Sequence, residues 1–445
     1  MKPIKRLRYA KELFLLAYPV SLGQVSHVMT NIADTVMLGN YNADHLAGAT
    51  FAFNVFIPLL VFSIGFSMGI TPFVTFAHVK NEDEELKSTT SNGLILFSFL
   101  GIALLAIGLS IGLFLDNMNQ PERVVILAEP YYYLLCFSMV PVIFSNLFKQ
   151  TTEGLSFTKP AMVISFASNG LNIILNYILI YGKLGFEPMG IVGAGIATLI
   201  ARVSLVVFSL IYILKNPLFR KALWNNPFIR YSFDKIIMLA KVSFPISMQF
   251  AMEVTAFAFS AIMIGWLGAT ALAAHQIAIT IAATTYLIST GLGAAATVKV
   301  GQAAALNDRV ALKEISITAF LMVIAFMGFT ALCLFFSRDL VPLFFVKNSE
   351  IEIIETASSL LVIAAIFQLS DGLQVAGHGV LRGIKDVKIP TLFSVVAYWV
   401  FGVPMGYLLS IKLGYGIQGF WFGLTLGLTI LALLLYLRVK KLVFN

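Results

Sequence analysis

The sequence predicts an all-α polytopic membrane protein with twelve transmembrane helices in two pseudo-symmetric halves of six. Hydrophobic residues make up 59% of the 445 residues and charged residues only 12%, whereas soluble domains contain about 25% charged residues. The apolar residues form twelve long runs, and the second half of the sequence repeats the first. A dozen spans with short connections leave no room for a sizeable soluble domain.

Each predicted span contains about 20 or more mostly apolar residues, the length that crosses a bilayer. We expect the twelve spans at residues 12–38, 45–78, 90–115, 125–149, 160–182, 190–214, 237–265, 271–304, 313–337, 352–381, 390–411 and 416–437. Several of them are longer than a bilayer requires, so we expect tilted or bent helices.

The basic residues are distributed unequally between the two sides that these spans define. With the N-terminus in the cytoplasm, 24 Lys and Arg residues fall on the cytoplasmic side and 5 on the outer side, while Arg202 falls within a span. Cytoplasmic loops of membrane proteins are enriched in Lys and Arg. The distribution therefore predicts that both termini are cytoplasmic, and it accounts for the net charge of +8 without a nucleic-acid partner.

An internal repeat relates the two halves of the chain. Shifts of 226 and 229 residues pair identical residues, among them Pro19 with Pro245, Met37 with Met263, Gly65 with Gly291, Gly154 with Gly383 and Lys159 with Lys388. Because each half holds an even number of spans, both halves have the same orientation, as in the parallel repeats of transporters. The polar connection 215–236 separates them, so we expect an N-terminal lobe at 1–225 and a C-terminal lobe at 226–445.

Three carboxylates lie within otherwise apolar predicted spans: Asp34, Glu253 and Asp371. A carboxylate in the bilayer core is costly, and such residues usually face a cavity or a partner on an ion or substrate path. Burial favours the neutral form of a carboxyl group, which helps it to bind and release a proton. Na⁺ would instead need several oxygen ligands, which the same residues can supply. The residues alone therefore leave the identity of a coupling cation open.

Polar side chains continue these positions along the helices at spacings of three and four residues. The stripes are Gln24, His27, Asn31 and Asp34; Ser165, Asn169, Asn172 and Asn176; Gln249, Glu253 and Ser260; Gln276, Thr280 and Thr284; and Asp371, Gln374 and His378. Such stripes indicate either a wet interior or hydrogen bonds between helices. Arg202 would either extend toward the interface or pair with a carboxylate.

The sequence contains no nucleotide-binding P-loop, no His/Cys cluster with metal-ligand spacing and no hydrolase motif. We therefore expect no direct ATP drive, no enzymatic activity and no cofactor. An interior with three carboxylates and few fixed cations would attract cationic, amphipathic compounds. The 38 Phe and 15 Met residues could add adaptable apolar contacts.

Three segments carry the longest recognisable patterns of the sequence: residues 31–50, NIADTVMLGNYNADHLAGAT; residues 244–278, FPISMQFAMEVTAFAFSAIMIGWLGATALAAHQIA; and residues 367–390, FQLSDGLQVAGHGVLRGIKDVKIP. Together they resemble the multidrug and toxic compound extrusion (MATE) family, and in particular its NorM-type subgroup. The first resembles the first-helix signature, the second the region of the seventh and eighth helices, and the third the tenth helix and the loop after it. The resemblance covers essentially the whole chain in the order and number of spans.

The resemblance implies two six-helix bundles separated by a central cleft, in the inner (plasma) membrane of a bacterium. It implies export of cationic or amphipathic drugs against an inward flow of Na⁺ or H⁺. The coupling residues that it implies are Asp34, Glu253, Asp371, Asn172 and Asn176, with a possible Na⁺ site at Glu253 and Asp371. The candidate residues of the substrate cavity are Gln24, His27, Asn31, Gln249, Gln276, Thr280, Gln374 and Phe367.

Two positions depart from the family pattern. Some members carry an aspartate at the position of Asn176, and NorM-type members carry a tyrosine at that of Phe367, so a hydroxyl ligand is missing there. Two other functions stay open: a channel, with uncoupled ion flux, and a flippase for lipid-linked oligosaccharides, whose cavity would hold more basic residues than Arg202. A repeat that builds its own cavity predicts a monomer, with small drugs and the lipid bilayer as its partners.

Overall fold

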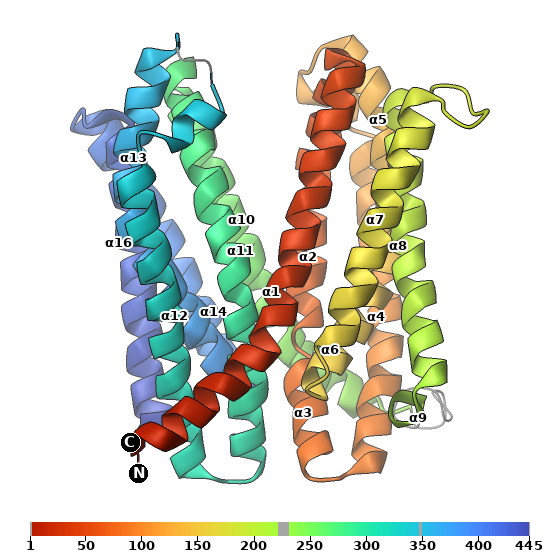
Figure 1. Cartoon of the computed structure of the whole chain (residues 1–445), viewed down its shortest axis with the longest axis vertical. Coiled ribbons are helices and arrows are strands. Elements are labelled where there is room, and N and C mark those ends of the chain that lie inside the picture. The colour runs from red at the N-terminus through yellow and green to blue at the C-terminus, as the bar shows by residue number, and fades with distance from the viewer. Residues whose placement is uncertain (1, 221–230, 347–348, 445) are drawn as a thin grey trace. The chain divides into compact units, whose positions relative to one another are not determined.

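The computed structural model describes residues 2–220, 231–346 and 349–444, and these residues are almost entirely helical (Figure 1). The first half contains α1 (Lys2–Tyr41), α2 (Ala43–Ser67), α3 (Thr71–Val79), α4 (Asp83–Gly112), η1 (Leu115–Met118), α5 (Glu122–Phe137), α6 (Met139–Gly154), α7 (Lys159–Tyr181), α8 (Gly190–Lys215) and α9 (Pro217–Phe219). The second half contains α10 (Phe233–Gly265), α11 (Ala269–Ala305), α12 (Arg309–Ser337), η3 (Val341–Phe344), α13 (Ile351–Gly383), α14 (Lys388–Val395), η4 (Val396–Gly402), α15 (Val403–Tyr407), η5 (Leu408–Lys412), α16 (Gly416–Val439) and η6 (Lys440–Phe444).

Twelve stretches of these helices are long and apolar enough to cross a membrane, which confirms the predicted number of spans within the described residues. They are Lys5–Tyr41, Ala43–Val79, Asp83–Gly112, Glu122–Gly154, Lys159–Tyr181, Gly190–Lys215, Phe233–Gly265, Ala269–Ala305, Arg309–Ser337, Ile351–Gly383, Lys388–Lys412 and Gly416–Phe444. The ends of these stretches reproduce the sequence repeat. Ala269–Ala305 begins and ends 226 residues after Ala43–Val79 begins and ends. Glu122–Gly154 and Ile351–Gly383 likewise lie 229 residues apart at both ends.

The chain folds into two compact units. We call Met1–Ser21 with Met248–Asn445 the C-terminal unit, and Leu22–Ser247 the N-terminal unit. The expected boundary between residues 225 and 226 lies outside the described residues. Two helices are divided between the units: the first half of α1 belongs to the C-terminal unit, and the first half of α10 belongs to the N-terminal unit.

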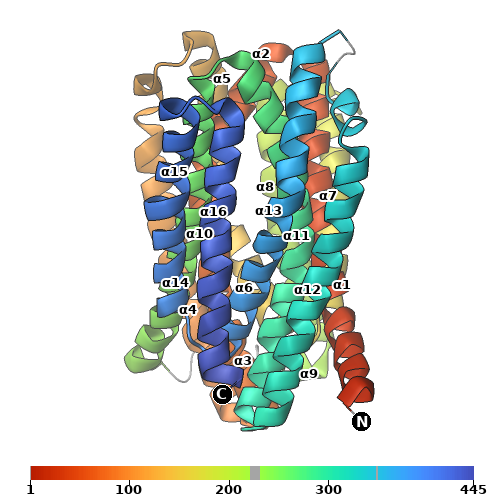
Figure 2. The ribbon, with the colours of Figure 1, turned by 90° about the vertical axis from the view of Figure 1, so that its left-hand side faces the viewer.

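In the C-terminal unit, α13 packs against α11, α12 and α16 (Figure 2). Small residues allow the closest approaches, because a Cβ atom on Gly423 would lie 2.2 Å from the backbone nitrogen of Gly406. Gly427 is similarly close to Gly402. Lipid gives helices little hydrophobic reason to associate, so close packing of small residues carries much of the association. These glycines fix the segment from η4 to α15 against α16.

The first half of α1 is attached to the C-terminal unit by two ion pairs. Arg6 Nε lies 2.6 Å from Glu314, and Lys299 Nζ lies 2.7 Å from Glu12. Lys313, the neighbour of Glu314, donates to the backbone oxygen of Phe444 at 3.0 Å. Both ends of the described chain therefore contact the start of α12, and they lie at the same end of this unit (Figure 1).

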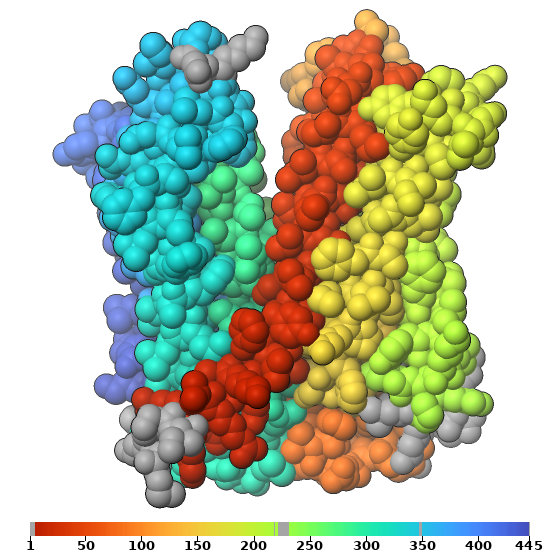
Figure 3. Space-filling view, in the orientation of Figure 1, coloured from red at the N-terminus to blue at the C-terminus, as the bar shows by residue number. Residues whose placement is uncertain are grey.

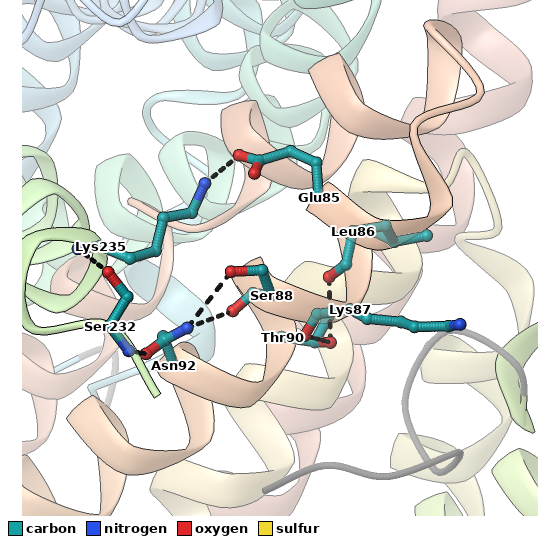
Figure 4. Close-up of polar contacts among 8 residues, drawn as sticks. All are labelled: Glu85, Leu86, Lys87, Ser88, Thr90, Asn92, Ser232 and Lys235. Carbon is teal, nitrogen blue, oxygen red and sulfur yellow. Dashed lines mark hydrogen bonds and ion pairs between the residues drawn. The ribbon is translucent and has the colours of Figure 1, made fainter. Parts of the chain in front are cut away.

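In the N-terminal unit, α2 packs against α5, α7 against α8, and α4 against α6. The first half of α10 joins this unit through the contacts drawn in Figure 4. Lys235 forms an ion pair with Glu85 and places its ammonium 5.9 Å from the centre of the Phe73 ring. The backbone N–H of Ser232 donates to Asn92 Oδ1 at 2.9 Å. One buried cation thus ties the connection between the two halves to α4.

We expect Glu85→Gln to destabilise this attachment, because it leaves the ammonium of Lys235, which is only 8% exposed, without its carboxylate. The cost should be about 1–3 kcal/mol, between the values for exposed and for buried ion pairs. A matched control exists on the same helix, where Glu84 pairs with Lys87 at 3.2 Å and is 57% exposed. Melting temperatures of the purified variants in detergent check this: Glu85→Gln should melt lower than Glu84→Gln, and equal values would contradict the anchoring role.

Candidate functional site

Two of the three predicted carboxylates meet in the C-terminal unit. The Nε2 amide of Gln374 donates to Glu253 Oε1 and to Asp371 Oδ1, at 2.9 Å in each case. Tyr398 lies beside them, with its hydroxyl 3.1 Å from Glu253 Oε1 and 3.0 Å from Gln374 Oε1. We call these four residues the C-terminal cluster; their exposed fractions are 7%, 4%, 1% and 0% for Glu253, Asp371, Gln374 and Tyr398.

Three helical segments position the C-terminal cluster. Asp371 and Gln374 are one turn apart on α13, so their side chains point to the same side. Glu253 comes from α10, and Tyr398 comes from the π-helical segment η4. Trp399, the next residue of η4, donates its indole N–H to the backbone oxygen of Met252 at 3.1 Å. Adjacent residues of η4 therefore contact adjacent residues of α10.

Glu253 and Asp371 each have one carboxylate oxygen that accepts no hydrogen bond from the described residues. Within the part of the chain that the structure describes, the hydrogen bonds to Glu253 and Asp371 all reach Oε1 and Oδ1. Their second oxygens, Oε2 and Oδ2, receive none. The donors are a neutral amide and a neutral phenol, which carry no charge that would balance an ionised carboxylate. Oxygens of this kind, in buried surroundings, suit a proton or a small hard cation.

Aromatic rings form an apolar wall beside the C-terminal cluster. The ring of Phe257 lies 5.9 Å from that of Tyr398 and 6.1 Å from that of Phe367. Phe367 in turn lies 5.7 Å from Trp421, which lies 5.8 Å from His275. Phe367 thus contributes a packed ring in this structure, and Tyr398 contributes the hydroxyl beside the carboxylates.

The third carboxylate, Asp34, belongs to a cluster in the N-terminal unit. Asn176 Nδ2 donates to Asp34 Oδ1 at 2.5 Å and to Asn172 Oδ1 at 3.1 Å, while Asn172 Nδ2 lies 3.5 Å from the hydroxyl of Thr198. We call these four residues the N-terminal cluster. Figure 3 shows the second half of α1 (red), which carries Asp34, against α7 (yellow), which carries both asparagines. A carboxylate from one helix and amides from its neighbour thus meet in this unit.

Arg202 lies in the same unit but contacts a hydroxyl and a ring. Its Nη1 donates to Ser138 Oγ at 2.6 Å, and its guanidinium lies 5.3 Å from the centre of the Phe56 ring. Among the described ion pairs, none includes Arg202. Its partner is therefore Ser138, which the sequence analysis did not identify.

A further hydrogen bond in this unit joins α7 to α1. Asn169 on α7 donates to Ser26 Oγ on α1 at 2.6 Å.

The structure places the remaining predicted residues outside both clusters. Gln249 is buried on α10, His27 and Asn31 are exposed on α1, and Gln24 is partly buried on the same helix. Gln276 and Thr280 are exposed on α11 and lie 3.4 Å from each other. Among the described residues, the side chains of Gln249, Gln276 and Thr280 make no hydrogen bond to a carboxylate of either cluster.

The described residues contain no group of three or more His, Cys, Asp and Glu side chains that could hold a metal ion. The C-terminal cluster has two carboxylates, an amide and a phenol instead. The sequence analysis did not include Tyr398 or Thr198 among the polar stripes. Signals were present, because Thr391, Ser394 and Tyr398 are spaced by three and four residues, and Thr198 precedes Arg202 by one turn.

Twelve candidate spans that repeat in two sets, each unit with a buried or partly buried carboxylate cluster, define a polytopic membrane transporter. The chain belongs to the MatE family, whose model matches residues 19–178 and 245–408. These two matches cover corresponding parts of the two halves and begin at Pro19 and Pro245, which the sequence repeat pairs.

Relatives from several bacteria are similar over nearly their whole length. The multidrug resistance protein NorM of Photobacterium profundum is 30% identical over 440 residues, which are 97% of this chain and 95% of that protein. The multidrug resistance protein MdtK of Proteus mirabilis is 31% identical over 444 residues, which are 98% and 96% of the two chains. The chain therefore aligns with whole transporters and not with one part of them.

Solved structures share the fold. A multidrug resistance MATE family transporter of the MOP superfamily, in an outward-facing conformation, superposes with a TM-score of 0.90 at 20% identity, over 100% of this chain and 98% of that chain. The eukaryotic MATE transporter AtDTX14 gives a TM-score of 0.88 at 21% identity, over 98% and 96% of the two chains. The predicted fold class is confirmed by these likenesses.

Proposed function

We propose that this protein exports cationic or amphipathic drugs in exchange for an inward flow of Na⁺ or H⁺. The C-terminal cluster is the observation that carries this proposal. Two carboxylates from different helices lie within hydrogen-bonding distance of one neutral amide, in a segment that spans the membrane. Placing two such groups together is costly unless they bind something, and coupling requires a group that loads and unloads a cation.

The bacterial relatives support the choice of substrate, because their names describe multidrug resistance proteins. Three carboxylates within the spans would favour positively charged compounds over anionic ones. The partly buried ring of Phe257 offers a contact for flat apolar groups, with the buried rings of Phe367 and Trp421 packed behind it. These features support a cationic, amphipathic substrate class.

Coupling follows if cation and drug favour different states of the protein. A cation that enters from outside neutralises Glu253, Asp371 or Asp34, which weakens drug binding and favours release of the drug outside. A drug that enters from the cytoplasm then displaces the cation. Opposed preferences of two ligands for two conformational states are sufficient for such exchange. We assign Asp34, Asn172 and Asn176 to the same task in the N-terminal unit.

Membrane orientation and oligomeric state belong to this proposal. The excess of Lys and Arg on one side favours cytoplasmic termini in a bacterial inner membrane. Both ends of the described chain contact the start of α12, which agrees with an even number of crossings. We propose an N-terminal and a C-terminal lobe in one chain that acts as a monomer.

Drug uptake into proteoliposomes tests the proposal, in the orientation that mimics export. A Na⁺ gradient and a pH gradient are imposed separately, with a fluorescent cationic drug as substrate. Uptake driven by Na⁺ alone would assign the carboxylates to a Na⁺ site, and uptake driven by the pH gradient alone would make them proton carriers. A folded protein that responds to neither gradient would contradict coupled export, and transport of lipid-linked oligosaccharides would be assayed next.

A further inference from the structure

The hydroxyl of Tyr398 faces two competing acceptors. Glu253 Oε1 lies 3.1 Å away and Gln374 Oε1 lies 3.0 Å away, so both are within hydrogen-bond distance. A phenol has only one hydrogen to donate, so it donates fully to one acceptor at a time. The better acceptor depends on the charge of Glu253, because hydrogen bonds to charged groups are stronger than those to neutral groups.

The side-chain amide of Gln374, unlike the hydroxyl of Tyr398, cannot exchange one hydrogen-bond partner for another. Both of its N–H groups are used, one on Glu253 and one on Asp371, which turns its oxygen toward Tyr398. The opposite orientation would place the amide oxygen against two carboxylate oxygens. Gln374 is thus a fixed bridge, and the phenolic hydrogen is the movable element of the C-terminal cluster.

The backbone around Tyr398 holds the ring while the hydroxyl hydrogen moves. Tyr398 is fully buried, and the indole of Trp399 fixes the adjacent turn to Met252. Gly402, at the end of η4, lies close to Gly427 on α16. The segment η4 is a π-helix, a conformation that is uncommon and often found at functional sites. The ring therefore has one position from which its hydroxyl reaches both acceptors.

The charged and titratable groups around Tyr398 come from three helices. Glu253 on α10, Asp371 on α13 and Tyr286 on α11 lie close enough to interact with it electrostatically. Arg382, also on α13, interacts with Tyr286. The nearest acceptor among them is Glu253, since it is the carboxylate that the hydroxyl contacts.

We infer that Tyr398 is a positioning residue that promotes release of the coupling cation, which rests on the proposed function. While a cation occupies the carboxylates, the hydroxyl donates to Gln374 Oε1. As the cation leaves, the hydroxyl turns to Glu253 Oε1 and stabilises the bare carboxylate. The hydrogen bond from Tyr398 to Glu253 is strongest when no cation is bound. It therefore opposes cation binding and favours release of the cation.

Replacing Tyr398 with Phe tests this role, because the ring stays and only the hydroxyl is lost. The half-saturating concentration of the driving cation should fall roughly tenfold, the factor that one hydrogen bond to a charged group represents. Maximal drug uptake should also fall, because release of the cation becomes slow. Transport is measured in proteoliposomes across a series of Na⁺ concentrations or, for H⁺, of external pH values.

Tyr132→Phe is the matched control in the other unit. Tyr132 is also fully buried, and its hydroxyl donates to the backbone oxygen of Gly108 at 3.0 Å, away from any carboxylate cluster. A loss of stability alone would lower abundance in both variants and leave their cation dependence equal to that of wild type. An unchanged half-saturating concentration in Tyr398→Phe would overturn the inference. A raised one would also overturn it, since it would mean that Tyr398 binds the cation directly.

A fluorinated tyrosine at position 398 gives a second, opposite test that keeps both ring and hydroxyl. 3-Fluorotyrosine is a stronger hydrogen-bond donor, so the half-saturating cation concentration should rise, and a fall would contradict the inference. Asp371→Asn, in the same assay, separates this inference from the proposed function. If the wild-type protein shows no gradient-driven uptake, the proposed function fails; if it couples and loses coupling in Asp371→Asn while the Tyr398 variants behave as wild type, the inference alone fails.

Discussion

Asp371→Asn should abolish drug accumulation driven by a cation gradient while the protein stays folded. Asparagine has nearly the same shape as aspartate, and its oxygen can still accept the hydrogen bond from Gln374 that Asp371 Oδ1 accepts at 2.9 Å. An amide cannot take up a proton at physiological pH and is a weaker cation ligand than a carboxylate. We therefore expect uptake under a gradient to fall to the level of empty liposomes.

Two measurements make this prediction specific. Exchange of labelled for unlabelled drug, without a gradient, should persist in Asp371→Asn at a raised drug concentration, because exchange needs no net cation movement and a neutral residue 371 weakens drug binding. Asp386→Asn serves as control, since it removes a carboxylate from an ion pair with Arg438 at 2.8 Å in the same unit. Full gradient-driven export by Asp371→Asn, at normal abundance, would remove this residue from the coupling site.

The fold could be predicted from sequence because membrane helices have a strong local signal. Apolar length alone places a helix in lipid, where every backbone polar group must be paired within the segment. The repeat also showed which spans of the two halves correspond. In the structure, Ala43–Val79 and Ala269–Ala305 correspond residue by residue at both ends. The division into units was not predictable in the same way. It depends on which unit the first halves of α1 and α10 pack against, and no local sequence pattern indicates that packing.

The site was predictable in part, for a similar reason. Carboxylates in apolar spans are easily recognised in a sequence. The sequence could not show, however, that Glu253 and Asp371 bind the same amide of Gln374. Tyr398 was not identified, although it follows Thr391 and Ser394 at helical spacing, because that spacing does not show which residues the hydroxyl contacts. Its role depends on η4, whose π-helical turn directs the hydroxyl at residues that are 145 and 24 positions away in the chain. Tertiary contacts of that kind leave no trace in composition or spacing.

Asp34→Asn should lower gradient-driven export by roughly tenfold or more, the factor that about 1.4 kcal/mol of lost cation binding represents. Asn176 donates to Asp34 Oδ1 at 2.5 Å and is itself fully buried, so the carboxylate is held in a defined place on α1. Asparagine at position 34 keeps an acceptor for Asn176 but removes the charge that a cation would balance. Abundance and melting temperature should change little, since the hydrogen bond and the packing survive.

Asp44→Asn is the control in the same unit, because Asp44 pairs with Arg123 at 2.9 Å and both side chains are exposed. The comparison with Asp371→Asn shows whether one cluster or two carry the coupling. If Asp34→Asn loses coupled uptake but keeps drug exchange, both clusters act in the transport cycle. If it exports as wild type does, the N-terminal cluster only joins α1 to α7, and the C-terminal cluster alone binds the cation. The second result would confine the coupling ion to Glu253 and Asp371, whose open oxygens then set the stoichiometry.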